Sequence, residues 1–380
     1  MQLTEEQLSL AESVREYCSK NTATVAQRDA LTEGGTQTTS RQVLADMAGF
    51  SWLGISLPEA YGGQGGTFLD EVVFLEASSR GLSLNHSYGT GLTAAQTYLK
   101  WGNEEQKTTI CTNLAAGKLE AISLSEPNTG SDLAGVRCKA VREGDEYVIN
   151  GQKTWCTAAH LAENILLLVR EDTSGTRHEG LTLLMVPANS PGLDIVAIET
   201  MEPHTVNELF FKDVRVPVSA VVGEAGQGWK QLMRGLSLER VIIAAYSLGA
   251  AQRSLDDTIA YVKQREAFGT KLASFQALRH RIADLATDIS MARSFVYDVA
   301  AKVDAGLEDS LAAESAMAKS RCTDIAQKAA LEGIQMHGGN GFTREYGMEA
   351  QLRAAIAPPI YGGANEVQRD IIAKALLGRP

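Results

Sequence analysis

The spacing of hydrophobic and polar positions divides the chain into three stretches, and the spacing in the first is typical of helices. Thr4 is followed three positions later by Gln7, which predicts a capping box opening an amphipathic helix that runs through Tyr17. The glycine-rich run 62–66 interrupts the helical spacing and predicts a loop. This texture predicts an N-terminal helical domain over residues 1–118.

The second stretch consists of short β-rich runs without helices between them. Asn150-Gly151 follows one such run and predicts a hairpin turn, because both residues tolerate positive φ. Spacing of this kind predicts a middle β domain over residues 119–225, built as an antiparallel sandwich or barrel. The runs are Leu119–Leu124, Glu146–Ile149, Asn164–Val169, Leu181–Val186, Leu193–Ile198 and Glu208–Phe211.

The third stretch is helical again after Gly228. Apolar residues at alternating steps of four and three mark one face of a long helix over 241–262 and of another over 278–303. Further helices are expected over 311–336 and at about 363–377. Together they predict a C-terminal domain over residues 226–380 that resembles a four-helix bundle. The predicted fold class is α+β, with three domains in the order helical, β and helical.

Composition narrows the possible partners and compartment. The net charge of −11 disfavours a nucleic-acid partner, because the phosphate backbone would be repelled. No apolar run reaches the roughly 20 residues of a membrane helix, and the start of the chain lacks a signal-peptide pattern. The five cysteines are scattered without a CxxC pair, and the histidines lack ligand spacing. We therefore expect a cytoplasmic protein without a membrane span or a metal site.

The middle stretch contains a turn rich in hydroxyls and exposed amides, Ser125–Asp132. Trp155 and Thr157 follow farther along the chain. On the residues alone, two interpretations remain open: a cradle for a polar ring edge or phosphate, or a surface turn with an ordinary core tryptophan. The glycines at 223–228 do not form GxGxxG, and no strand–helix unit surrounds them, which disfavours a Rossmann nucleotide site.

Five motifs in order make the sequence similar to the acyl-CoA dehydrogenase family, over nearly its whole length. They are Glu-Pro-x-x-Gly-Ser-Asp at 126–132, Asn-Gly-x-Lys-x-Trp-x-Thr at 150–157, Arg-x-x-Phe-Gly-x-x-Leu-x-x-x-Gln at 265–276, Gln-x-x-Gly-Gly-x-Gly at 335–341, and an Ile-Tyr turn entering a helix at 360–369. The resemblance implies FAD as cofactor and the three-domain architecture that the texture predicts independently.

The resemblance also assigns cofactor contacts. Trp155 is expected to cover one flavin face, and Thr157 to hydrogen-bond the ring. The other residues expected around the isoalloxazine ring are Leu124, Ser125, Gly130 and Ser131. The pyrophosphate and adenine end is expected at Arg265, Phe268 and Gln276. Backbone contacts to FAD are expected at Ala364 and Glu366, where the family usually has threonine and glutamine.

In this family the Gln-x-x-Gly-Gly motif reaches the FAD of a neighbouring subunit. The corresponding residues are Gln335, Gly338 and Gly339, and close-approach glycines suit such a contact because a Cβ would hold the backbone away. The resemblance therefore implies a homo-oligomer, assembled as a dimer of dimers.

The sequence departs from the commonest members at the catalytic base. Those members place a glutamate directly after the tyrosine of the last motif, where this chain has Gly362. Glu239 is the candidate replacement, because members like isovaleryl-CoA dehydrogenase take the base from this earlier position. The alternative makes Glu239 a carboxylate at the head of the helix expected near 241, or a solvated partner of Arg240. Substrate contacts are expected at Ser131, Arg240, Gly362 and Gly363.

The expected reaction is α,β-dehydrogenation of an acyl-CoA thioester to the trans-2-enoyl-CoA, with electrons passed to an electron-transfer flavoprotein. Two kinds of alternative remain open. The first keeps the fold and changes the reaction: an enoyl-CoA reductase, an enzyme acting on a carrier-protein-bound acyl group, or one that passes electrons to oxygen. The second is an inactive flavin-binding homologue. The absent glutamate at Gly362 also suggests space for branched or bulky acyl groups. Neither the acyl chain nor the electron acceptor follows from the sequence.

Overall fold

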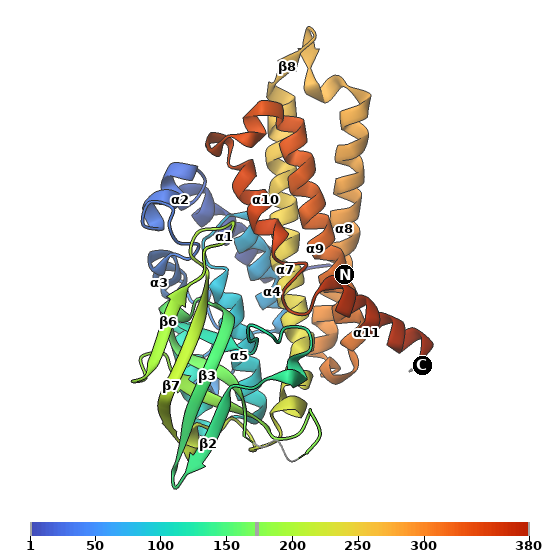
Figure 1. The fold of residues 1–380 in the computed structure, drawn as a ribbon. Coiled ribbons are helices and arrows are strands. Elements are labelled where there is room, and N and C mark those ends of the chain that lie inside the picture. The colour runs from blue at the N-terminus through green and yellow to red at the C-terminus, as the bar shows by residue number, and fades with distance from the viewer. Residues whose placement is uncertain (1, 172–174, 379–380) are drawn as a thin grey trace. The chain divides into compact units, whose positions relative to one another are not determined.

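A computed structural model describes residues 2–171 and 175–378, and Figure 1 draws its ribbon. The chain forms two compact units. A β-rich unit contains Thr36–Gly66 and Asn85–Leu236; a helical unit contains the chain up to Gly35, Thr67–Leu84 and the chain from Ser237 onwards. The outermost residues of the predicted first and third domains, 1 and 379–380, lie outside the described residues. The domain boundaries near 118 and 225 stay a prediction.

The β-rich unit is built on a seven-stranded sheet in the order β1-β4-β2-β3-β7-β6, with β5 paired to β4. Its strands are β1 (Leu119–Ser123), β2 (Lys139–Glu143), β3 (Glu146–Thr157), β4 (Ala162–Arg170), β5 (Leu181–Pro187), β6 (Leu193–Ala197) and β7 (Val206–Pro217). Its helices are α3 (Arg41–Gly49), α5 (Ser87–Trp101) and α6 (Glu104–Ala115). All six predicted runs are strands, and β2 is an additional one.

Pairing in this sheet is mixed, so the expectation of a wholly antiparallel sheet is wrong. β1 runs parallel to β4, and β2 meets β4 in parallel at one residue pair. The remaining pairs are antiparallel. One face of the sheet is apolar, as the alternating burial of Leu209, Phe211, Val214 and Val216 along β7 shows. These residues pack with apolar side chains of the neighbouring strands in the core of the β-rich unit.

The hairpin predicted at Asn150-Gly151 is wrong, because β3 continues through both residues. The turn lies earlier: Glu143 pairs with Glu146, and Gly144 at φ +63° occupies the connection. Gly151 instead sits at a β-bulge opposite β7, with φ +148°. A Cβ there would lie 2.8 Å from the Cα of Cys138, so close strand approach explains this glycine.

We expect Gly151→Ala to destabilise the protein by about 1–3 kcal/mol, because alanine rarely adopts this φ and its Cβ would overlap Cys138, the residue before β2. Urea unfolding followed by circular dichroism measures the effect. Gly49→Ala is the matched control, since no atom lies within 4 Å of an added Cβ at that helix end. Equal unfolding midpoints for the two variants would contradict the bulge interpretation.

The helical unit consists of helices that the sequence predicts and of others that it does not. They are α1 (Glu5–Asn21), α2 (Val25–Leu31), α4 (Phe68–Arg80), α7 (Gly228–Gln264, whose first turns belong to the β-rich unit), α8 (Gln276–Asp304), α9 (Ala312–His337), α10 (Met348–Ile356) and α11 (Asn365–Leu377). β8 (Glu266–Ala267) and β9 (Thr270–Lys271) pair between α7 and α8. The capping box of Thr4 and Gln7 is confirmed. α10 is an addition, and α7 begins at Gly228 rather than near 241.

A buried carboxylate and a close helix contact tie the helical unit together. Glu76 on α4 accepts hydrogen bonds from Arg293 Nε and Tyr297 Oη on α8, both at 2.7 Å. A Cβ on Gly249 of α7 would lie 2.3 Å from the Glu76 carbonyl oxygen, so α7 approaches α4 closely at this glycine. α4, α7 and α8 are therefore fixed against one another.

Two further findings concern the predicted class of protein. Among the described residues, no helix combines the length and apolar character needed to cross a bilayer. All five cysteines are buried and free, so they form neither a disulfide framework nor an exposed thiol site.

Candidate active site

The loop after β1 is stapled to β3 by a buried ion pair. Lys153 Nζ lies 3.0 Å from Glu126 Oε1 and donates a second hydrogen bond, of 2.8 Å, to the Leu124 carbonyl. Lys153 is fully buried and Glu126 is 9 % exposed. The Glu126 carboxylate also accepts the backbone N–H groups of Arg137 and Cys138, each at 2.8 Å. A carboxylate with this many donors is well compensated for its burial.

This ion pair brings the first two sequence motifs together. Thr154 donates its backbone N–H to the Ser125 carbonyl at 3.0 Å, so the strand bearing Trp155 runs beside Ser125. The loop after Ser125 makes a tight turn, in which Glu126 and Thr129 exchange both backbone hydrogen bonds. Sequence reasoning assigned no role to Glu126 or Lys153, although both are fixed positions of the motifs it used. Their role is to hold the loop in place.

Trp155 is displayed outward in a strained conformation. Its φ is +61°, it sits at a bulge between β3 and β7, and 60 % of its surface is exposed. A tryptophan at positive φ costs free energy, and strained residues of this kind cluster at functional sites. The interpretation of Trp155 as an ordinary core residue is therefore wrong. Thr157, two residues on, is half-buried and pairs with Val206.

The far end of the loop after β1, at residues 130–132, is open to solvent. Gly130 and Ser131 are exposed, and no atom lies within 4 Å of a Cβ built on Gly130. Asp132 forms an ion pair with Arg177 at the surface. A flat apolar ring beside hydroxyls and open backbone fits a flavin ring, which has one polar edge and two apolar faces. The residues of this unit therefore fit FAD on the evidence of their own geometry.

In the helical unit, α7 and the turn before α11 bring Glu239 beside Gly362. A Cβ built on Gly362 would lie 3.8 Å from both Cδ and Oε1 of Glu239. The two positions that the sequence analysis weighs for the base therefore lie side by side. The alternative of a helix-terminal carboxylate is wrong, because α7 begins at Gly228 and the dipole effect fades within the first turn.

The space beside Gly362 is filled rather than empty. The same Cβ would lie only 2.4 Å from Cδ1 of Ile243, one turn of α7 beyond Glu239. The expected space for a bulky acyl group is therefore occupied by the isoleucine side chain at this point. Ile243 was missed by sequence reasoning, because only the fold shows which face of α7 meets the turn.

Burial governs the charges around Glu239. It raises the pKa of the Glu239 carboxyl above its usual range, and the positive charges of Arg240 and Lys319 partly oppose that shift. Burial lowers the pKa of the Arg240 guanidinium, which is 8 % exposed. Among the described residues, Arg240 Nε has no hydrogen-bond partner. A buried unpaired donor fits a residue that contacts a ligand, which is the role expected of Arg240.

The turn at Gly362 and Gly363 is held from inside. Gln368 Nε2 donates to both carbonyls, at 3.1 and 2.8 Å, and Lys319 Nζ donates to the Gly363 carbonyl at 3.0 Å. Both glycines have positive φ, which favours glycine at each position. Ala364 caps α11 without a side-chain hydrogen bond, and Glu366 is exposed and pairs with Arg369. Sequence reasoning missed Lys319 and Gln368, which lie far from Glu239 along the chain.

The residues expected at the adenine end gather at one tip of the helical unit. Arg265, Phe268 and Gln276 are exposed around the β8–β9 hairpin, which Figure 1 shows at the end of the bundle away from α11. Phe268 is 95 % exposed with φ +52°, and its ring contacts the Phe275 ring edge to face. The fold thus separates this group from Glu239 within the unit.

The Gln-x-x-Gly-Gly motif closes α9 and is exposed. Gln335, Gly338 and Gly339 all lie at the surface of the helical unit. Gly338 needs its positive φ of +61°, but no atom of the described chain lies within 4 Å of a Cβ built on either glycine. Contacts within the described chain therefore do not explain the small size of Gly339. A close approach by a group from outside the chain would explain it.

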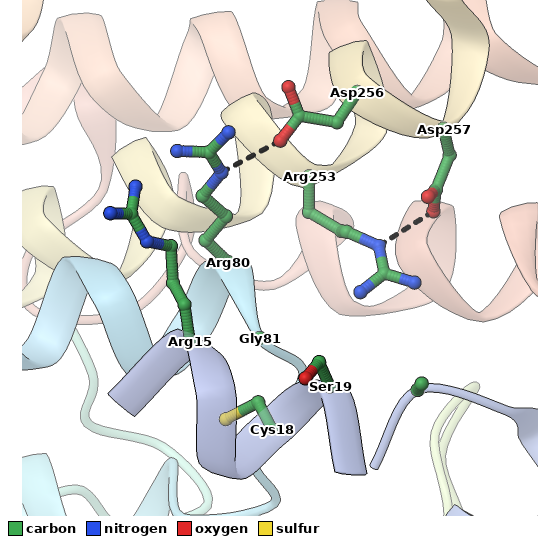
Figure 2. Close-up of a pocket in the computed structure, with 9 residues that line it drawn as sticks. Arg15, Cys18, Ser19, Arg80, Gly81, Arg253, Asp256 and Asp257 are labelled. Carbon is green, nitrogen blue, oxygen red and sulfur yellow. Dashed lines mark hydrogen bonds and ion pairs between the residues drawn. The ribbon is translucent and has the colours of Figure 1, made fainter. Parts of the chain in front are cut away.

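A hollow of about 250 Å³ in the helical unit lies apart from these residues. Figure 2 shows Arg80 of α4 bonded to Asp256 of α7, Arg253 bonded to Asp257 along α7, and Cys18 of α1 among the lining residues. Burial raises the pKa of the Cys18 thiol to about 11, which keeps it protonated at neutral pH. Four of the charged groups pair with one another and Arg15 pairs with Glu12, and none of the expected site residues lines the hollow.

Comparison with known proteins assigns the whole chain. Three domain models match in order: "Acyl-CoA dehydrogenase, N-terminal domain" over residues 4–118, "middle domain" over 121–214 and "C-terminal domain" over 226–377. A probable acyl-CoA dehydrogenase of Bacillus subtilis is 36 % identical over 387 residues, covering 99 % of each chain.

Other relatives carry more specific names. The mitochondrial isovaleryl-CoA dehydrogenase of Pongo abelii is 33 % identical, covering 98 % of this chain and 89 % of that protein. A subunit of the caffeyl-CoA reductase–Etf complex of Acetobacterium woodii is 31 % identical, covering 99 % and 100 %. The crystal structure of an acyl-CoA dehydrogenase from Geobacillus kaustophilus superposes with a TM-score of 0.90 at 32 % identity, covering 99 % of each chain. The chain therefore belongs to the acyl-CoA dehydrogenase family of FAD-dependent oxidoreductases.

Proposed function

We propose that the protein dehydrogenates an acyl-CoA thioester between its α- and β-carbons, with Glu239 as the base that takes the α-proton. The observation that carries this proposal is the placement of the Glu239 carboxyl 3.8 Å from the position a Cβ would take on Gly362. The family's commonest base is the residue at that turn, so a glutamate at either position would place its carboxyl in the same part of the site. The likeness to isovaleryl-CoA dehydrogenase supports this subgroup.

A carboxylate with an ordinary pKa is too weak a base for the α-proton of a thioester. Burial raises the pKa of Glu239, which makes its carboxylate a stronger proton acceptor. Among the described residues, no acceptor is found for the backbone N–H groups of Gly362 and Gly363. We assign the Gly362 N–H to the thioester oxygen, where a fixed donor stabilises developing negative charge. Bound FAD supplies the acceptor for the β-hydride.

Four groups of this chain would hold the cofactor. The loop at Leu124, Ser125, Gly130 and Ser131 and the exposed ring of Trp155 would hold the flavin, and Thr157 would donate to it. The tip of the helical unit would take the pyrophosphate and adenine end through Arg265, Phe268 and Gln276. Gln335, Gly338 and Gly339 would reach the FAD of a second copy, and Ala364 and Glu366 would contribute backbone contacts. This arrangement implies a homo-oligomer, proposed as a dimer of dimers.

The proposed electron acceptor is an electron-transfer flavoprotein, and the likeness to a subunit of the caffeyl-CoA reductase–Etf complex supports it. The same relative favours a second candidate, reduction of an enoyl-CoA. Both reactions use the same residues in opposite directions, so the direction has to be measured. The substrate contacts proposed for either reaction are Ser131, Arg240, Gly362 and Gly363.

We expect acyl-CoA to bleach the flavin band of the purified holoenzyme under anaerobic conditions. A panel of straight-chain, branched and cyclic acyl-CoAs is added to the enzyme, and absorbance in the flavin region is followed. Reoxidation of the bleached enzyme is then timed with electron-transfer flavoprotein and with oxygen. Faster reoxidation by the flavoprotein would support that acceptor. No bleaching by any acyl-CoA, with reoxidation of chemically reduced enzyme by enoyl-CoA, would favour the reductase.

A further inference from the structure

A buried ammonium lies beside the proposed base and has no part in the chemistry described so far. Lys319 on α9 is fully buried, although lysine is among the residues least often found inside proteins. Its Nζ donates to the Gly363 carbonyl and to Asn365 Oδ1, each at 3.0 Å. Asn365 in turn bonds Thr323 and Asp324 of the same helix. This network fixes the turn before α11 to α9.

The network determines which way the turn presents its backbone. Both carbonyls of the Gly362–Gly363 pair are occupied from inside, by Lys319 and Gln368. Because the N–H of a peptide unit points opposite to its C=O, holding these two carbonyls inward turns the N–H groups of Gly363 and Ala364 the other way. The Gly362 N–H belongs to the preceding peptide, and the bond to the Gly362 carbonyl anchors the residue that carries it. The turn borders Glu239, since an added Cβ on Gly362 would lie 3.8 Å from its carboxyl.

The charge of Lys319 also acts on Glu239. Burial lowers the pKa of Lys319 to about 8, and the negative charge of Glu239 opposes that shift. The other charges acting on Lys319 are Arg240 on α7, Asp324 on α9 and Glu366 on α11. Arg369 pairs with both Asp324 and Glu366, whereas the cations that act on Glu239 are Arg240 and Lys319.

We propose that Lys319 is a positioning residue for the reaction: it fixes the Gly362–Gly363 turn in the orientation that receives the thioester oxygen, and its charge tunes the proton affinity of Glu239. This inference rests on the proposed function. Lysine suits both tasks, because an ammonium offers three donors and a full positive charge from one atom. Gln368 shares the first task but carries no charge.

The two tasks predict different effects for two substitutions. Lys319→Met removes the turn contact and the charge, and Gln368→Met removes turn contacts alone. Without the charge, the pKa of Glu239 rises, because Lys319 opposes the upward effect of burial. The rate constant of flavin reduction, which needs ionised Glu239, should then reach half its limiting value about one pH unit higher. Both variants should lower the limiting rate about tenfold, with KM changed less than about threefold.

The measurement is stopped-flow flavin reduction of the holoenzyme at saturating acyl-CoA between pH 5 and pH 9. Lys319→Arg keeps the charge and should restore the parental pH midpoint. Lys328→Met is the matched control, because Lys328 lies on the same helix, is exposed and pairs with Asp288. If Lys319→Met does not fold, Lys319→Arg and Gln368→Met still carry the test: both should keep the parental midpoint and lose rate.

Three results would overturn the inference. They are a parental midpoint and limiting rate in Lys319→Met, an equal pH shift in Lys319→Arg, and parental limiting rates in both fallback variants. Thermal stability lowered without any change in these kinetics would make Lys319 structural only. Absence of bleaching in the parent enzyme is a separate outcome, since it rejects the proposed dehydrogenation before Lys319 is considered.

Discussion

Glu239→Gln should lower the rate constant of flavin reduction by acyl-CoA by about 10³- to 10⁴-fold, near the upper end of what a general base contributes. Glutamine keeps the shape of the side chain and its place beside Gly362, but it cannot accept the α-proton. Among the described residues, no group donates a hydrogen bond to the Glu239 carboxylate, so the substitution leaves no donor unpaired. We therefore expect flavin content and the unfolding midpoint to stay at parental values.

Anaerobic stopped-flow absorbance measures this effect, with the best substrate from the acyl-CoA panel. Glu345→Gln is the matched control, because Glu345 is exposed in a surface turn of the same unit. Reduction of Glu239→Gln at the rate of this control would place the base elsewhere. A loss of flavin along with activity would instead indicate that Glu239 helps to hold the cofactor.

Much of the architecture follows from residue pattern alone. The stripes of apolar residues over 241–262 and 278–303 lie within α7 and α8, and every predicted β run is a strand. The pattern failed where local signals compete with pairing. Asn150-Gly151 has the composition of a hairpin turn, but the bulge opposite β7 uses the same freedom of the glycine.

The position of helix starts was also hard to predict. The run Gly228–Leu238 contains two glycines and no clear apolar stripe, so the sequence predicts a helix start only near 241. The helix begins at Gly228 and contains both glycines. This difference matters for the site, because it moves Glu239 from a helix end, where a carboxylate stabilises the dipole, to an interior position where it has no such role.

Sequence motifs predict only those residues of the candidate site that belong to the motifs themselves. Motifs identify Trp155 and Gly362, but they do not show which residues hold these positions. Lys319 and Ile243 were missed because their importance comes from contacts with a distant turn. Burial of a lysine is visible only once its surroundings are known, since nothing in the local run of α9 distinguishes Lys319 from Lys328.

The second large effect is expected from the buried pair of the β-rich unit. Lys153→Met should lower the free energy of unfolding by about 3–5 kcal/mol, because it leaves the Glu126 carboxylate buried without its cation. The same change frees the Leu124 carbonyl and loosens the loop from β3. Flavin content should fall with stability, since Ser125, Gly130 and Ser131 belong to that loop. Guanidinium unfolding and the ratio of flavin to protein absorbance measure the two effects.

Lys212→Met provides the comparison, because Lys212 is an exposed residue of β7 in the same sheet and its substitution should change the unfolding free energy by less than about 0.5 kcal/mol. Replacing Glu126 as well should not restore stability, because the backbone N–H groups of Arg137 and Cys138 would then lose their acceptor. The pair therefore differs from a simple buried salt bridge, which an apolar pair can replace. Lys153→Met could instead have the same free energy of unfolding as Lys212→Met and keep its flavin. Other contacts would then hold this loop, and the role assigned to Glu126 and Lys153 would be wrong.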